Sequence, residues 1–183
     1  NRIIDMLEQA DNEKDPILKQ SLLTFVVVGA GFAGIETAGE IHDFLLDARK
    51  FYPTISENDI RVIVLEGLPI VLPGFSEKLA KFTKDKLIQK GIDIRLNTQV
   101  VTFDGSEVIT KEAIDPSRNP VKDPHMEAIE TKTLIWTAGV TPVDTIKNSM
   151  FKMDKGKIIV NENLQVPQFP EVYVIGDCSL TID

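Results

Sequence analysis

The sequence predicts an α/β fold, in which a doubly wound parallel sheet carries an antiparallel β meander as an insertion. Three observations support this. The β-branched run at 25–28 has no polar alternation, as is typical of a parallel strand buried on both faces. Amphipathic helical segments then separate it from apolar runs at 60–65 and 92–96. Beyond residue 99 the pattern changes to short strands around turns.

Length, charge and cysteine content exclude several classes of protein. A chain of 183 residues suffices for one domain, or one domain plus a fragment. Its 20 basic and 28 acidic residues give a net charge of −8, and the basic residues are scattered, which argues against a nucleic-acid partner. No apolar run reaches the length of a membrane span. One cysteine excludes an internal disulfide, which fits a reducing, cytoplasmic location. Two histidines that are distant in sequence leave no credible metal cluster.

Residues 1–22 are expected to form a leading helical segment without catalytic function. Ile3, Leu7 and Ala10 share one face of a short amphipathic helix. Asp15 followed by Pro16 is a typical helix start and predicts a second helix to about residue 22. Because the chain begins without methionine or a signal peptide, we expect a segment of a longer protein.

The glycines after the first strand have the spacing of a dinucleotide-binding turn in a Rossmann-like fold. Gly29 allows the sharp turn, Gly31 lets the backbone approach a pyrophosphate, and Gly34 lets the helix pack on the strand. The following helix offers unpaired amides to a phosphate, so Phe32 and Ala33 also belong to the predicted cofactor-binding residues. An ordinary strand-to-helix turn remains the alternative.

The helix predicted from Ala33 to about Lys50 carries one carboxylate of interest. Glu36 falls in the expected first turn, close to the path of a bound dinucleotide. It either interacts with the helix dipole or faces a nicotinamide ribose or ring, and spacing alone does not decide. The stripe expected to face the core comprises Ile35, Ala38, Ile41, Leu45 and Leu46.

Glu66 ends the second predicted strand, where an acidic residue binds the adenosine ribose hydroxyls in this architecture. No Lys or Arg follows for many residues, so nothing obvious would hold a 2′-phosphate. This favours NADH over NADPH, and a plain charged strand terminus is the alternative. The next helix should begin at Ser76 and end before Gly91, with inward-facing Leu79, Phe82 and Leu87.

The second half of the chain adds the meander and two small candidate sites. A hairpin at 100–110, a proline-containing loop at 111–124 and a return strand at 126–130 make up the meander. The segment 133–137 then leads to Ala138 and Gly139, where the backbone could approach a cofactor, although a plain turn glycine explains the pattern nearly as well.

Two further apolar strands are predicted at 157–160 and 172–175. The second stops at Gly176 and Asp177, which places a carboxylate at the carboxyl edge of a sheet, where ligands bind in α/β proteins. The alternative is a helix cap. Cys178 lacks a CxxC partner, which argues against disulfide redox chemistry.

Four blocks in this order, VVVGAGFAGIETAGE, VIVLEG, LIWTAGVTP and VYVIGDCS, carry a family resemblance. The chain resembles the two-dinucleotide-binding flavoprotein reductases, and among them the type II NADH dehydrogenases, single-subunit FAD-dependent NADH:quinone oxidoreductases of the respiratory chain. The resemblance covers nearly the whole chain. It is specific for the superfamily and less so for the quinone reductases.

The resemblance implies roles for the candidate residues. Gly29, Gly31 and Gly34 would cradle the NADH pyrophosphate, and Glu66 would hold the adenosine ribose. Glu36 would face the nicotinamide near the flavin. Ala138 and Gly139 would line the dinucleotide path. Asp177 would contact the ribityl or phosphate part of FAD.

It also implies that the chain is one part of a larger enzyme. Residues 23–154 would be the NADH-binding domain and residues 155–183 a stub of a discontinuous FAD-binding domain. The parent would pass a hydride from NADH to FAD and electrons to a quinone. It would touch the inner face of a membrane only through segments absent from this sequence. We expect the chain alone to be colourless, catalytically incomplete, and either dimeric through its exposed terminal strand or folded back on itself. An NAD(H)-sensing module and a methyltransferase are the competing hypotheses.

Overall fold

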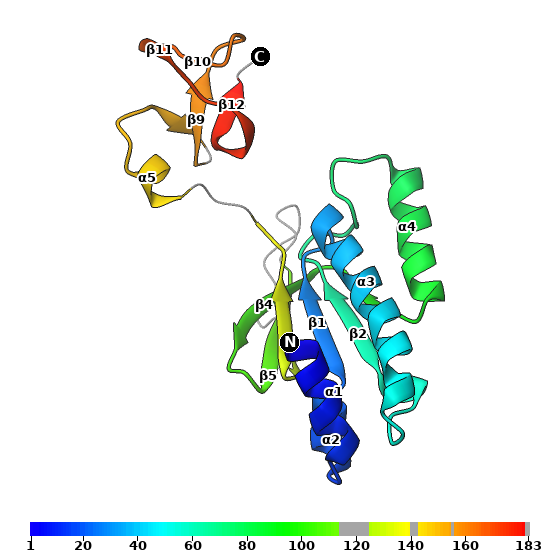
Figure 1. The fold of residues 1–183 in the computed structure, drawn as a ribbon. Coiled ribbons are helices and arrows are strands. Elements are labelled where there is room, and N and C mark those ends of the chain that lie inside the picture. The colour runs from blue at the N-terminus through cyan, green and yellow to red at the C-terminus, as the bar shows by residue number, and fades with distance from the viewer. Residues whose placement is uncertain (114–124, 140–142, 155, 182–183) are drawn as a thin grey trace. The chain divides into compact units, whose positions relative to one another are not determined.

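A computed structural model describes residues 1–113, 125–139, 143–154 and 156–181. The chain divides into two compact units, Asn1–Ala138 and Gly139–Asp183 (Figure 1). The loop predicted at 111–124 was wrong at its start, because Lys111 and Glu112 belong to strand β5 (Glu107–Glu112), and residues 114–124 lie outside the described residues.

A four-stranded parallel sheet is the centre of the first unit. Its order is β3 (Asp93–Arg95), β2 (Arg61–Leu65), β1 (Thr24–Val28) and β7 (Thr133–Trp136). Each neighbouring pair is parallel. The chain moves from β1 to β2 and β3 on one side, whereas β7 adds on the other side. The strand order therefore reverses at β1, and the carboxyl end of that strand is the expected ligand crevice.

The helices pack on one face of this sheet (Figure 1). They are α1 (Arg2–Asn12), α2 (Pro16–Leu22), α3 (Phe32–Ala48) and α4 (Glu77–Gln89), with short 3₁₀ turns at Arg49–Phe51 and Glu57–Asp59. The Asp15 carboxylate accepts from the amide of Ile17 at 2.9 Å and caps α2, as predicted. The core on this face includes Leu7, Ala10, Phe25, Val27, Ala38, Leu45, Val62, Val64 and Leu87.

The predicted meander covers the opposite face and makes the unit three-layered. It consists of β4 (Thr98–Phe103), β5 (Glu107–Glu112) and β6 (Met126–Glu130), paired antiparallel in that order. Val108 and Ile129 pack there against alternate residues of β1 and β2, namely Val26, Val28, Ile63 and Leu65. Every residue of β1 is buried as a result, which confirms both the prediction of a two-sided buried strand and the α/β fold class.

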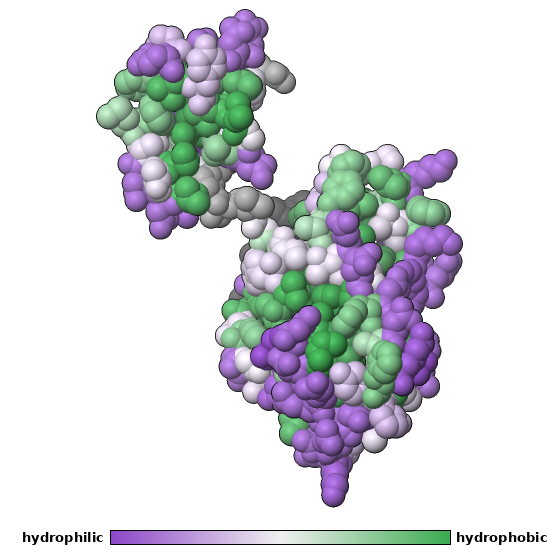
Figure 2. Space-filling model, in the orientation of Figure 1, coloured by the Kyte–Doolittle hydropathy of each residue, from purple (hydrophilic) through white to green (hydrophobic). Residues whose placement is uncertain are grey.

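The orientation predicted for α4 was partly wrong. Leu79 and Phe82 were expected to face the core but are 40% and 60% exposed, whereas Ala80 and Leu87 are buried. Positions 80 and 87 lie two turns apart on one face, and 79 and 82 lie off that face. Figure 2 shows apolar residues at the surface of the first unit where α3 and α4 begin.

The second unit is a small β structure with its own core. Its elements are α5 (Asp144–Lys147), β8 (Met153–Asp154), β9 (Lys157–Val160), β10 (Gln165–Val166), β11 (Phe169–Tyr173), a 3₁₀ turn at Gly176–Cys178 and β12 (Ser179–Thr181). The strand predicted at 157–160 is confirmed. Residues 143–154 pack within this unit too. The functional boundary predicted at residue 155 stays a prediction.

The strand predicted at 172–175 was wrong in its bounds, because β11 ends at Tyr173. Its pairing with β10 is antiparallel and irregular, and does not continue past that residue. Val174 is buried in the small core and donates its amide to the carbonyl of Leu164 at 3.0 Å, whereas Ile175 is 68% exposed. A single continuous exposed apolar strand is therefore not present among these described residues.

Candidate dinucleotide-binding site

The turn between β1 and α3 presents free backbone donors. Gly31 is the N-cap residue of α3, and no side chain of the described residues caps this end. The first amides of a 17-residue helix, those of Phe32, Ala33 and Gly34, have no acceptor within the helix. They also carry the positive end of the helix dipole. An anion such as a phosphate is the natural ligand for this arrangement.

Gly29 and Gly34 are required by close packing. Gly29 has φ +102°, and a Cβ atom there would lie 3.0 Å from atoms of Ala138. At Gly34 a Cβ atom would lie 1.8 Å from the carbonyl oxygen of Gly29 and 2.7 Å from Thr137 Oγ1. The helix can start this close to the strand only because the side chain is absent, as predicted.

Gly31 differs from the other two glycines. No atom of the described residues lies within 4 Å of where its Cβ would be, and its φ of −73° is accessible to any residue. Packing against the part of the chain that the structure describes therefore does not explain the glycine. The open space is where the sequence predicts a pyrophosphate to approach.

Thr137 fixes the turn from the side of β7 and was missed by the sequence analysis. Its amide and its hydroxyl both donate to the carbonyl of Val28, at 2.9 and 2.7 Å. Trp136 donates its indole N–H to the carbonyl of Ala138 at 2.5 Å. The signal was a hydroxyl residue directly before Ala138 in the LIWTAG block. Ala138 thus lies against the glycine turn, and Gly139, with φ +74°, follows it.

Glu66 lies at the same edge of the sheet, directly after β2. Its side chain is half-buried, and its two oxygens are both engaged. Oε2 accepts from the amide of Ala30 at 2.7 Å, and Oε1 accepts from the amide of Leu68 at 2.9 Å. The structure therefore brings the predicted ribose acceptor and the glycine turn into direct contact. Ribose binding itself stays a prediction.

The loop after Glu66 is a second part of the site that the sequence analysis missed. Leu72 donates its amide to the carbonyl of Ala30 at 2.8 Å. Phe75 meets Phe32 edge to face, with ring centroids 4.8 Å apart. Both rings are largely exposed, at 47% and 61%. Two exposed aromatic rings in contact thus lie at the start of α3, where its free amides are.

The helix-dipole interpretation of Glu36 was wrong. Helix α3 begins at Phe32, so Glu36 is its fifth residue, and the first turn contains no acidic residue. The dipole effect falls off within the first turn. Glu36 is exposed, and no hydrogen bond or ion pair engages it within the part of the chain that the structure describes. Its place near a nicotinamide stays a prediction.

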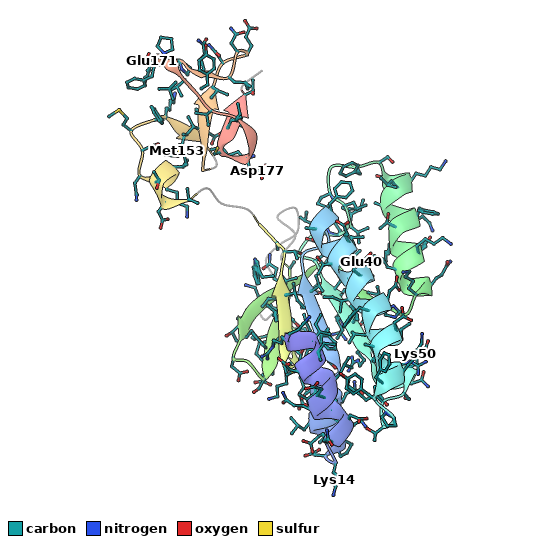
Figure 3. All side chains as sticks on the ribbon, in the orientation of Figure 1. Lys14, Glu40, Lys50, Met153, Glu171 and Asp177 are labelled. Atoms are coloured by element: carbon teal, nitrogen blue, oxygen red, sulfur yellow. The ribbon has the colours of Figure 1, made fainter. Side chains whose placement is uncertain are left out.

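Asp177 belongs to the second unit. It sits in the 3₁₀ turn Gly176–Cys178, where Gly176 has φ +74°, and its side chain is exposed (Figure 3). Cys178 donates its thiol to the carbonyl of Ile175 at 3.2 Å. A contact of Asp177 with FAD stays a prediction.

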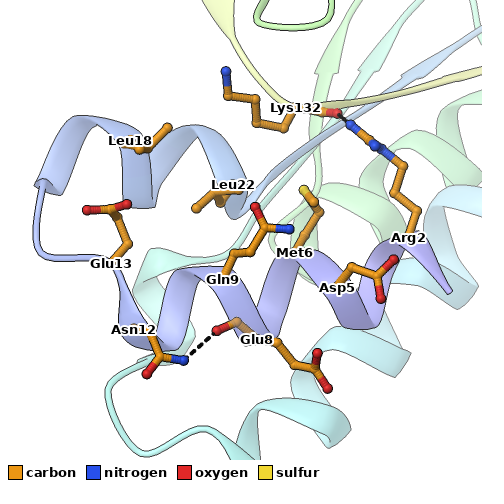
Figure 4. A pocket seen from close by; sticks show the side chains of 10 residues that line it. All are labelled: Arg2, Asp5, Met6, Glu8, Gln9, Asn12, Glu13, Leu18, Leu22 and Lys132. Carbon is orange, nitrogen blue, oxygen red and sulfur yellow. Dashed lines mark hydrogen bonds between the residues drawn. The ribbon is translucent and has the colours of Figure 1, made fainter.

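Other kinds of site are not evident among residues 1–113, 125–139, 143–154 and 156–181. These residues contain no cluster of three metal-ligating side chains, and none of their helices is long and apolar enough to cross a membrane. A pocket of about 630 Å³ lies between α1, α2 and Lys132, with its lining residues drawn in Figure 4. None of the predicted site residues lines it. Acidic, basic and apolar side chains all line it.

The family model for pyridine nucleotide-disulphide oxidoreductases matches residues 2–183. The chain belongs to this family. It is also a homologue of type II NADH:quinone oxidoreductases. It is 34% identical to the external alternative NADH-ubiquinone oxidoreductase of Yarrowia lipolytica, over 98% of this chain and 31% of that protein. It is 32% identical to the type II NADH:quinone oxidoreductase Ndh of Mycobacterium tuberculosis, over 96% of this chain and 37% of that protein.

A solved structure supports the fold. NDH2 from Plasmodium falciparum, determined in complex with NADH, superposes with a TM-score of 0.84 over 98% of this chain, at 24% identity. This chain covers 36% of that one. It therefore spans about a third of the length of the relatives it matches, and the activity of a whole enzyme is not carried over with the fold.

Proposed function

We propose that this chain is the NADH-binding part of a flavin-dependent NADH dehydrogenase, which passes a hydride from NADH to FAD and then electrons to a quinone. The observation that carries the proposal is the glycine turn at the end of β1, with free amides at α3 and the Glu66 carboxylate in contact with it. The names of the relatives, which include NADH:quinone oxidoreductases, support the choice of substrates.

The residues of the first unit fit a dinucleotide that runs across the sheet edge. The diphosphate would accept hydrogen bonds from the amides that follow Gly31, in the open space beside it. Glu66 would accept hydroxyl protons of the adenosine ribose. Glu36, exposed one turn further along α3, would face the nicotinamide end. Ala138 would line the path between these positions, and Gly139, which follows it in the chain, is the first residue of the second unit.

The second unit offers part of a flavin site. Gly176 with φ +74° makes a turn that exposes the Asp177 carboxylate. A carboxylate accepts hydrogen bonds from hydroxyl groups and repels phosphate, so Asp177 fits the ribityl chain of FAD better than its phosphates. When bound, FAD would supply the acceptor for the hydride and the route to a quinone. The chain itself would bind and orient the nucleotide.

Fluorescence anisotropy of NADH, titrated with the 183-residue chain, tests the proposal. We expect the anisotropy to rise and saturate, and ADP-ribose to reverse it, because ADP-ribose carries the same diphosphate and ribose. S-adenosylmethionine should not compete. A flat titration, or competition by S-adenosylmethionine alone, would overturn the proposal.

An NAD(H)-sensing module is the runner-up function. Both functions need the glycine turn, but only the dehydrogenase needs Asp177. Replacement of Asp177 by Ala in the full-length protein should lower its flavin content at unchanged NADH affinity. An unchanged flavin content would favour the sensor.

A further inference from the structure

Ala30, the residue between the first two glycines, is held entirely by the segment that follows β2. It is completely buried. Its amide donates to Glu66 Oε2 at 2.7 Å, and its carbonyl accepts from the amide of Leu72 at 2.8 Å. A buried backbone donor without an acceptor is strongly unfavourable, so this geometry depends on the carboxylate.

The other groups of the turn do not depend on Glu66. The amide of Gly29 donates to the carbonyl of Leu65 at 2.8 Å, and the carbonyl of Val28 is bonded to Thr137. Ala30 is therefore the point at which the turn is attached to the side chain that directly follows β2. Through its other oxygen, Glu66 also holds Leu68 at the start of the loop.

We propose that Glu66 is a positioning residue for the glycine turn as well as the acceptor for the ribose. The second half of this statement rests on the proposed function, and the first half does not. A carboxylate has two acceptor oxygens, whereas a glutamine amide has one oxygen and one NH₂ donor. In Glu66→Gln, one of the two amides, that of Ala30 or that of Leu68, would face a donor.

This arrangement has a consequence for nucleotide choice. If Glu66 were only the group that excludes a 2′-phosphate, its neutralisation would admit NADPH. Because the same carboxylate sets the turn, Glu66→Gln should lose NADH without gaining NADPH. The Glu66 side chain would then determine both the preference for NADH over NADPH and the geometry of the glycine turn.

Amide hydrogen exchange by NMR on the ligand-free 183-residue chain tests the positioning role. In Glu66→Gln, exchange should accelerate at least tenfold at Ala30 or Leu68, while Gly29 stays unchanged. Glu40→Gln, an exposed carboxylate on α3 (Figure 3), is the matched control and should alter neither. Unchanged exchange at both Ala30 and Leu68 would overturn the proposal.

Inorganic pyrophosphate as a ligand separates the two roles, because it lacks a ribose. Loss of a nearby negative charge alone would strengthen pyrophosphate binding. A displaced turn would weaken it, and we expect at least fivefold weaker binding in Glu66→Gln. Equal or tighter binding would contradict the positioning role.

Glu66→Asp keeps the charge and provides a second variant if Glu66→Gln fails to fold. The shorter side chain should not reach both amides, so pyrophosphate binding and the protection of Ala30 should both decrease. Retention of both would also overturn the proposal. A different result is that the wild-type chain fails to bind NADH while the protection of the Ala30 amide against hydrogen exchange still depends on Glu66. That result would reject the proposed function and keep the positioning role.

Discussion

The two units of the chain differ in how their candidate ligand groups are supported. In the first unit, the glycine turn lies on a parallel sheet covered on both faces, and the turn is hydrogen-bonded to Leu65 at the end of β2, to Glu66 directly after it and to Thr137 directly after β7. In the second unit, Asp177 stands on a single 3₁₀ turn above a core of four buried residues, Ile158, Val160, Val166 and Val174. Ligand-binding groups keep their geometry before the ligand arrives only where the scaffold is rigid. We therefore expect the first unit, rather than the second, to bind its nucleotide without help from other parts of a protein.

Gly34→Ala should have the largest effect, because it breaks the contact between helix and strand. Its methyl group would lie 1.8 Å from the carbonyl of Gly29. We expect a loss of about 1–3 kcal/mol in the free energy of unfolding, as for overpacked cores, and loss of NADH binding. Urea denaturation and calorimetry measure both.

Gly39→Ala on the same helix is the matched control for that variant. Among the residues that the structure describes, none has an atom within 4 Å of its Cβ position. Removal of a mid-helix glycine should stabilise the chain by about 0.5–1 kcal/mol and leave NADH binding unchanged. Equal behaviour of the two variants would show that the close approach at Gly34 is not required.

Gly31→Ala should separate binding from stability. The added methyl group meets no atom of residues 1–113, 125–139, 143–154 and 156–181, and the φ of −73° at this position is ordinary for alanine. We expect the free energy of unfolding to change by less than about 0.5 kcal/mol. NADH affinity should fall at least tenfold, because the methyl group occupies the predicted place of the pyrophosphate. Unchanged affinity would remove Gly31 from the site.

The second unit should open before the first one does. With a smaller core, the amides of β9 and β12 should exchange with solvent faster than those of β1 and β2. Hydrogen exchange on the whole chain measures this, together with light scattering for the predicted dimer. Equal protection in both units would remove the contrast between them, and a monomer whose C-terminal end is labile to protease would contradict the predicted self-association.

Phe75→Ala should weaken NADH binding by a smaller factor. Loss of an edge-to-face pair removes about 0.5–1.5 kcal/mol, and Phe32 then loses its neighbour at the start of α3. If this pair of rings holds the first amides of α3 in place, NADH affinity should fall roughly threefold to tenfold. Phe82→Ala, on the outer face of α4, removes a ring that is 60% exposed, against 47% for Phe75, and should leave affinity unchanged.

The smallest effect concerns the turn between β4 and β5. The amides of Glu107 and Ser106 donate to the Asp104 carboxylate and hold its pKa below the usual 3.8. A carboxylate with a lowered pKa stabilises the fold above its unfolded pKa, and this contribution is lost as the pH falls through the folded value. Asp104→Asn should therefore be less stable than wild type at pH 7. The difference should vanish at a pH below the folded pKa, as measured by denaturation at both values.

The sequence predicted those features that depend on local pattern. Buried strands, the glycine spacing and the acidic residue after β2 all follow from residues close together along the chain. Partners far apart in sequence were missed, because nothing local pairs Thr137 with Val28 or Phe75 with Phe32. The burial of Leu79 and Phe82 was predicted wrongly, since apolar spacing gives a stripe but not which neighbour covers it.

Calorimetric titration of the 183-residue chain with NADH and with NADPH tests the central claim most directly. The claim is that the first unit forms a nucleotide site in which Glu66 accepts hydrogen bonds from an adenosine ribose that carries no 2′-phosphate. The account predicts measurable NADH binding, at least tenfold tighter than NADPH, to a colourless protein. Equal affinity for both nucleotides, or no binding of either, would contradict it.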